Sequence, residues 1–169
     1  MNNSKKFNHG SSLFLIFLLF STSILSLKIL KKVNIQNIRI AGSELFSQND
    51  VIDNSSLKIP IRLIFINTSY LEKELKKNLS LKNVSVSRRI IPFGLKVYLK
   101  TRTPIAFGER ILDNERITGF IDKDGIFINK KNADNINLSE INIKVFGWNE
   151  KFKKILSEIF IAQENSDFE

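Results

Sequence analysis

The segment 84–106, VSVSRRIIPFGLKVYLKTRTPIA, constrains the fold more than any other part of the 169-residue chain. Its first part alternates valine with serine, and its later part alternates leucine and valine with lysine and tyrosine. This is the period of strands that have one buried face. Pro92 and Gly94 separate the two runs and predict a turn. Pro104 cannot donate to a strand ladder, so the second strand is expected to end before it.

A spacing within this segment matches a known pattern. Counted from Pro92, apolar residues follow at the third, fifth and seventh positions, Arg102 at the tenth, Pro104 at the twelfth and Ala106 at the fourteenth. The spacing resembles that of the FtsQ/DivIB family of bacterial cell-division proteins, in which it closes a small domain called POTRA. Arg89 and Pro92 stand at the family's Arg-x-x-Pro element, whereas Thr101 replaces the usual glutamate. The family-motif positions expected to be structural are Gly42, Arg89, Pro92, Leu95, Pro104, Ala106, Asp122 and Gly125.

The preceding chain predicts the other elements of such a domain. Residues 33–41 predict a strand with a bulge at Gln36 and Asn37. Ser47 is expected to start a short helix, and Asn67, Thr68 or Ser69 a second one that has leucines spaced by four. The predicted order is therefore strand, helix, helix, strand, strand. The resemblance implies an α+β fold over 33–106, in which two helices cover one face of a three-stranded sheet.

Residues 107–162 predict a partial β-rich domain. The sequence Asp-Lys-Asp-Gly at 122–125 lies between two apolar runs and favours a turn. Asp122 and Asp124 are also candidates for a metal or acid/base pair, but Gly125 is at the fourth position, whereas a calcium loop needs glycine at the sixth. A strand over 141–145, a helix after Gly147 and a polar tail over 163–169 are expected. Family members normally continue with further strands, so the chain resembles a member shortened at its carboxy terminus.

The amino-terminal part predicts a membrane anchor. Residues 11–27 contain no charge, and 11–30 reach about the 20 residues that a transmembrane helix needs. The alternative is a cleaved signal peptide, which would give a secreted binding protein with no division role. With the resemblance, the anchor implies a short cytoplasmic tail over 1–10, contact with membrane lipid, and an extracytoplasmic (periplasmic) domain. The expected location is the bacterial inner membrane at the division septum.

Charge and composition limit the chemistry. The formal net charge is +9. Outside the amino-terminal segment, the excess of basic over acidic residues is concentrated in Lys58–Arg102. This excess predicts a solvated face or a surface for an acidic protein or lipid, and nucleic-acid motifs are missing. The chain has no cysteine, and its one histidine is His9. We therefore expect no enzyme activity, no catalytic residue, no metal and no cofactor.

The resemblance implies a protein that binds and links other membrane proteins of the division machinery and helps to control septal peptidoglycan synthesis. The strand over 95–100 is interpreted as an exposed edge that could accept a partner strand. The alternative is a solvent-facing sheet whose lysines discourage aggregation. An outer-membrane assembly protein also contains POTRA modules, but it would need a long barrel. The residues predicted to bind partners are Arg88, Arg89, Lys96, Tyr98, Lys100 and Arg102.

Overall fold

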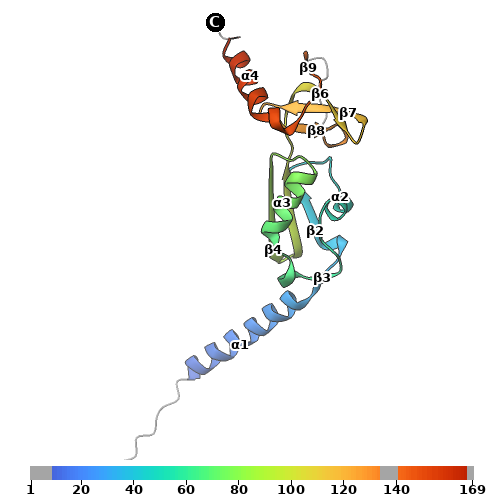
Figure 1. Ribbon diagram of the computed structural model, residues 1–169. Helices are drawn as coiled ribbons and strands as arrows, with labels where there is room; N and C mark the ends of the chain where they lie inside the picture. The colour runs from blue at the N-terminus through green and yellow to red at the C-terminus, as the bar shows by residue number, and fades with distance from the viewer. Residues whose placement is uncertain (1–8, 134–140, 167–169) are drawn as a thin grey trace, which may run out of the picture.

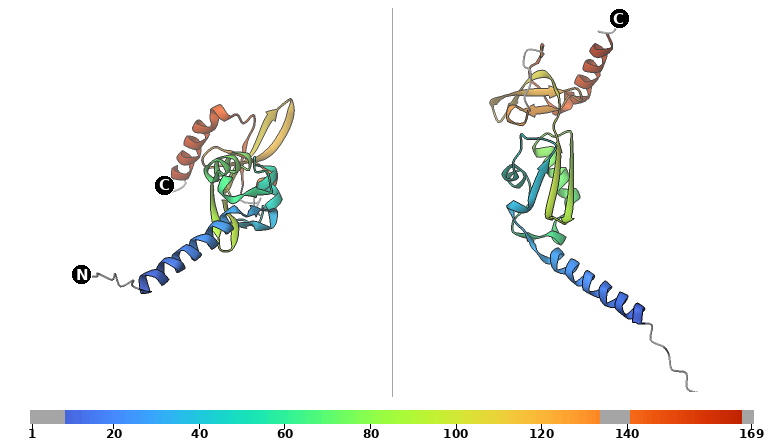
Figure 2. Two further views of the ribbon diagram at one scale, coloured as in Figure 1. Left: turned by 90° about the horizontal axis from the view of Figure 1, so that it is seen from below. Right: turned by 180° about the vertical axis from the view of Figure 1, so that it is seen from behind.

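The protein is an α+β chain whose parts follow one another along a line (Figure 1). The computed structural model describes residues 9–133 and 141–166. A long helix lies at one end, a first module over 32–100 lies in the middle, and a second module over 104–166 lies at the other end. The view from behind in Figure 2 gives the same order. Three residues, 101–103, join the modules.

The expected transmembrane helix needs correction. Helix α1 spans His9–Leu30, and its side chains are described only over 12–23. In the part of the chain that the structure describes, no helix is both long and apolar enough to cross a membrane. The anchor predicted over 11–30 is therefore not confirmed. Most of the tail expected over 1–10 and the end of the tail expected over 163–169 lie outside the described residues.

The first module contains the predicted three-stranded sheet. Its strands are β2 (Ile38–Ala41), β4 (Asn83–Ile90) and β5 (Phe93–Lys100), in the order β2-β5-β4. β4 and β5 form the antiparallel pair that the alternation and the turn residues predict, with Val86 opposite Val97. β2 lies parallel to the other side of β5. The central strand of this sheet is thus β5, which comes last of the three along the chain.

Both predicted helices form, and a polar side chain begins each one. Helix α2 is Gln48–Asp53; Ser47 Oγ accepts the Asp50 N–H, and the Asp50 carboxylate accepts the Ser47 N–H. Helix α3 is Thr68–Asn78, and Asn67 Oδ1 accepts the Tyr70 N–H at 3.0 Å. These bonds satisfy donors that a first helical turn leaves free.

The two helices cover one face of the sheet. Val51 of α2 and Leu71 and Leu75 of α3 share a buried cluster with the inward residues of β4 and β5. Those inward residues are Val84, Val86, Leu95, Val97 and Leu99. The fully buried positions follow the spacing of four in α3 and of two in the strands, as amphipathic elements require.

The segment 33–41 differs from the expected bulged strand. It divides into β1 (Lys32–Val33), a 3₁₀ turn (Ile35–Asn37) and β2. β1 pairs with β3 (Ile61–Arg62), which is followed by a second 3₁₀ turn (Leu63–Phe65). The phase slip in the sequence therefore marks a change of sheet, because residues before and after it pair with different strands.

The second module contains a four-stranded sheet in the order β8-β7-β6-β9. Its elements are β6 (Pro104–Leu112), β7 (Glu115–Asp122), β8 (Phe127–Asn129), a 3₁₀ turn (Lys130–Asn132), β9 (Ile143–Val145), a 3₁₀ turn (Glu150–Phe152) and helix α4 (Lys153–Ser166). The predicted turn over 122–125, the strand within 141–145 and the last helix are confirmed. The long strand β6 was not expected. It begins at Pro104, so residues 104–106 belong to the second sheet and not to the first.

Candidate partner-binding surfaces

The outer face of the first sheet brings together three of the predicted partner-binding residues. Lys96, Tyr98 and Lys100 of β5 are exposed, because they alternate with buried Leu95, Val97 and Leu99. On the same face Lys96 lies between Arg39 of β2 and Ser87 of β4. The face away from the helices is therefore polar and cationic around Lys96, with the Tyr98 ring 42% exposed beside it.

The interpretation of β5 as an edge strand is wrong. β5 pairs with β4 along its whole length and with β2 over Leu95–Tyr98, so it is the central strand of the sheet and most of the predicted edge already has a strand on both sides. The outer edge of β4 is also partly occupied, since the Val86 N–H donates to Glu72 Oε1 of α3 at 2.7 Å. A partner of this module would therefore contact side chains and would not extend β5.

The structure separates the two neighbouring arginines. Arg88 lies opposite buried Leu95 and therefore on the helix side, where its guanidinium donates to the Ile66 carbonyl at 2.6 Å. Arg89 lies opposite Gly94, on the other side of the sheet. Only Arg89 can share the outer face with Lys96, because successive residues of a strand point to opposite faces.

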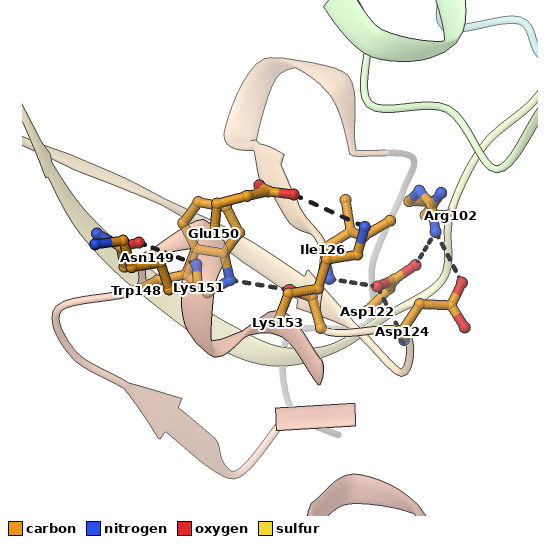
Figure 3. Close-up of polar contacts among 10 residues, drawn as sticks. Arg102, Asp122, Asp124, Ile126, Trp148, Asn149, Glu150, Lys151 and Lys153 are labelled. Atoms are coloured by element: carbon orange, nitrogen blue, oxygen red, sulfur yellow. Dashed lines mark hydrogen bonds and ion pairs between the residues drawn. The ribbon is translucent and has the colours of Figure 1, made fainter. Parts of the chain in front are cut away.

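Arg102 is not part of an exposed surface. Its side chain is 7% exposed and lies at the junction between the modules, where it pairs with Asp122 and, at 2.9 Å, with Asp124 (Figure 3). The other Asp122 oxygen accepts the N–H groups of Asp124 and Ile126, at 3.1 and 2.8 Å. We call Arg102, Asp122 and Asp124 the junction clamp. The predicted turn residues thus fix the residue that follows the first module.

The remaining family-motif positions are structural in this chain. Leu95 and Ala106 are buried, one in each module. Pro92 lies in the turn between β4 and β5, and Pro104 is the first residue of β6, a strand position that proline tolerates. Gly42 and Gly125 have φ of +92° and +73°, and a Cβ on Gly125 would lie 2.2 Å from the Lys153 carbonyl oxygen. The start of α4 therefore rests against the turn.

A groove lies on the second sheet beside its edge strand β9. It has a volume of about 390 Å³, and one of its lining residues, Phe146, has a side chain that is 74% exposed. β9 pairs with β6 only, so within the described residues no strand pairs with its outer edge. The residues that line the groove are Phe107, Gly108, Glu109, Thr118, Gly119, Lys144, Val145 and Phe146. This apolar groove and open edge are features that the sequence did not indicate.

The perturbed carboxylates lie in helix contacts and not in a cleft. The Ser47 hydroxyl lowers the pKa of Asp50 below its usual value, and the Ser56 N–H lowers that of Glu74. The hydrogen bond to Glu74 raises the pKa of Tyr70. Over the described residues, no group of three or more His, Asp or Glu side chains is placed to hold a metal ion. The geometry that stands out is that of surfaces and a junction.

Comparison with known proteins identifies the first module. Residues 33–102 match the model of the FtsQ-type POTRA domain. The chain is similar to the cell division protein DivIB of Clostridium acetobutylicum, with 28% identity over 127 residues that cover 75% of this chain and 47% of the relative. The chain thus spans about half the length of the curated relative that it matches. The match covers the sheet and both helices described above, so the first module is an FtsQ-type POTRA domain in a chain that is similar to DivIB.

Proposed function

We propose that this protein acts in bacterial cell division, at the septum, as a protein that binds and links other proteins of the division machinery. The observation that carries the proposal is the FtsQ-type POTRA domain over 33–102, in a chain that is similar to a cell division protein over most of its length. Through its partners the protein would help to control septal peptidoglycan synthesis, and it would not make peptidoglycan itself. Its partners would be membrane proteins of that machinery.

Two surfaces support binding as the mode of action. The outer edge of β9 offers backbone groups to a partner strand, and Phe146 and the adjoining groove offer apolar contact. The outer face of β5 offers Lys96, Tyr98 and Lys100 as side-chain contacts. An exposed aromatic ring with cations around it is typical of residues that contribute to protein interfaces.

Localisation and rescue test the division role. A fluorescent fusion of the full chain is expressed in dividing cells depleted of their native copy. The proposal expects a band at midcell and restored division. A uniform distribution without restored division would contradict it.

The outer face of β5 is tested by Tyr98→Asp combined with Lys100→Glu. Both side chains are exposed, so the fold is expected to persist while midcell localisation and recovery of division proteins by pull-down decrease. The matched control is Lys154→Glu, which reverses the charge of an exposed lysine on α4. Unchanged localisation and unchanged pull-down of the double variant would exclude this face as an interface.

A further inference from the structure

The two modules enclose a cationic cleft at their junction. Its volume is about 520 Å³, a size typical of ligand pockets. Six of its lining residues are basic and one, Glu150, is acidic. The basic residues are Lys73, Lys76 and Lys77 of α3, Arg102, Arg110 of β6 and Lys153 of α4. We call this the junction cleft.

Most of the positive charge in the cleft has no acidic partner in the described residues. Lys153 lies 3.8 Å from Glu150, and Arg102 is held by the junction clamp. Lys73, Lys76 and Lys77 make no ion pair within the described chain, nor does Arg110. The nearest helix carboxylates face other groups, since Glu72 accepts the Val86 N–H and Glu74 the Ser56 N–H. Like charges facing one cleft attract anions strongly.

The arginines of the cleft are already oriented. The Arg110 guanidinium carbon lies 4.5 Å from the centre of the Phe127 ring and 6.0 Å from the Trp148 ring. Arg102, nine-tenths buried, is fixed by two carboxylates (Figure 3). The Nε groups of both arginines are shielded and have no hydrogen-bond partner in the described residues, which is an uncommon and costly state.

The shape of the cleft distinguishes between anionic ligands. A single phosphate group needs a few donors that converge on one point. Here the lysines follow one another along more than a turn of α3, and Lys153 lies on a different helix. Ile126, Phe127 and Trp148 also line the cleft. The indole Nε1–H of Trp148 already donates to the Gly125 carbonyl at 2.9 Å, so the ring is left for packing. Spread cations beside an apolar wall fit a segment that carries several carboxylates and an apolar side chain.

We propose that the junction cleft binds an acidic peptide segment of a partner protein, with carboxylates along α3 and at Arg110 and with an apolar side chain against Trp148. The inference rests on the proposed binding function and names the chemistry of one partner segment. It also gives the junction clamp a role, because the clamp fixes Arg102, which lines the cleft, to the turn of the second module.

The probe is a fluorescein-labelled peptide, Glu-Glu-Phe-Glu-Glu-Phe-Glu, whose binding to the full chain is followed by fluorescence anisotropy. Lys73→Gln with Lys77→Gln is expected to weaken binding about tenfold. The matched control, Lys58→Gln with Lys82→Gln, removes the same charge from exposed positions outside the cleft and outside the β5 face, and is expected to change affinity less than about twofold. A peptide with glutamine in place of glutamate should not bind measurably.

Three results would overturn the inference: no saturable binding, equal weakening by both lysine pairs, or displacement of the peptide by inorganic phosphate but not by sodium chloride of equal ionic strength. The last would assign the cleft to a small anion. The assay separates this inference from the proposed function. If the chain localises and restores division but does not bind the peptide, only the inference about the cleft is refuted. If it binds the peptide selectively but does not localise or restore division, the proposed division role is refuted.

Discussion

Asp122 is the residue on which the joint between the modules depends most. Asp122→Ala leaves buried Arg102 with one half-exposed partner and leaves two backbone N–H groups without their acceptor. Breaking a buried ion pair is costly, so we expect a loss of about 3 kcal/mol in the free energy of unfolding, measured by urea denaturation. The control Asp124→Asn changes a half-exposed carboxylate and should cost less than about 1 kcal/mol. Equal losses would contradict the clamp.

Gly94 is a second residue whose identity the fold requires. Its φ is +139°, and a Cβ there would lie 1.9 Å from the Asn37 carbonyl oxygen. Gly94→Ala must therefore move the backbone of the turn before β2, and we expect a loss of more than about 2 kcal/mol. Gly147→Ala is the control, because it also has positive φ but meets no atom within 4 Å. It should cost about 1 kcal/mol. If Gly94→Ala lowered the free energy of unfolding less than Gly147→Ala, the turn before β2 would be able to move without a large cost.

At the scale of elements, Glu74 ties α3 to the loop that follows α2. Its carboxylate accepts the Ser56 N–H at 2.9 Å and the Ser56 hydroxyl at 2.8 Å, and the backbone bond is the main cause of its lowered pKa. The Glu74 carboxyl has a lower pKa in the folded than in the unfolded chain, where it is near 4.5, so its ionised form stabilises the fold above that pH. The stabilisation is lost as the pH falls through the pKa of the folded chain.

The consequence is testable by acid titration of stability. Glu74→Gln should lower the free energy of unfolding at neutral pH, and the difference from the unmodified protein should shrink as pH falls below about 4.5. Ser56→Ala removes only the hydroxyl donor and should have a smaller effect, since the backbone donor remains. If the difference in free energy of unfolding between Glu74→Gln and the unmodified protein did not change at acid pH, the contribution of this contact would be excluded.

Local signals in the sequence predicted the local elements. The alternation around Pro92, the polar side chains that begin α2 and α3, and the turn over 122–125 depend on neighbours in the chain, and each element formed. The central position of β5 was missed because it depends on β2, which is remote in sequence. Strand β6 was missed because Gly108 and its charged neighbours interrupt the alternation, although the positive-φ pair Asp113–Asn114 marks its turn.

The candidate site was harder to predict than the fold. Lys96, Tyr98 and Lys100 were placed on one face correctly, since period two decides that. Arg102 is among the residues predicted to bind partners, yet it is buried because two carboxylates some twenty residues later reach it. The junction cleft was not predicted at all, because its cations come from α3, β6 and α4 and only the tertiary structure brings them together.

At the scale of the whole molecule, the two modules have separate cores. The buried cluster of the first module contains residues from Val33 to Leu99 only, and the two clusters of the second module begin after the junction. We therefore expect residues 32–101, produced alone, to keep the native fold. The measurement is a heteronuclear NMR spectrum, whose dispersed signals should overlay those of the same residues in the full chain except near Leu79, which accepts a bond from Asn132. Collapse of the dispersion would show that the first module needs the second.

The parallel pairing of β2 with β5 has a consequence for biosynthesis. Ile38 leaves the ribosome about 57 residues before its partner Leu95, which corresponds to roughly 3 to 11 s at bacterial rates of translation. During that interval β2 has no neighbour in its own sheet, because β4 attaches only through β5. The nascent chain therefore carries an unpaired, mostly apolar strand until residues 95–98 are made and can pair with it. Its protection in that interval depends on α2, α3 and any chaperone that holds the chain.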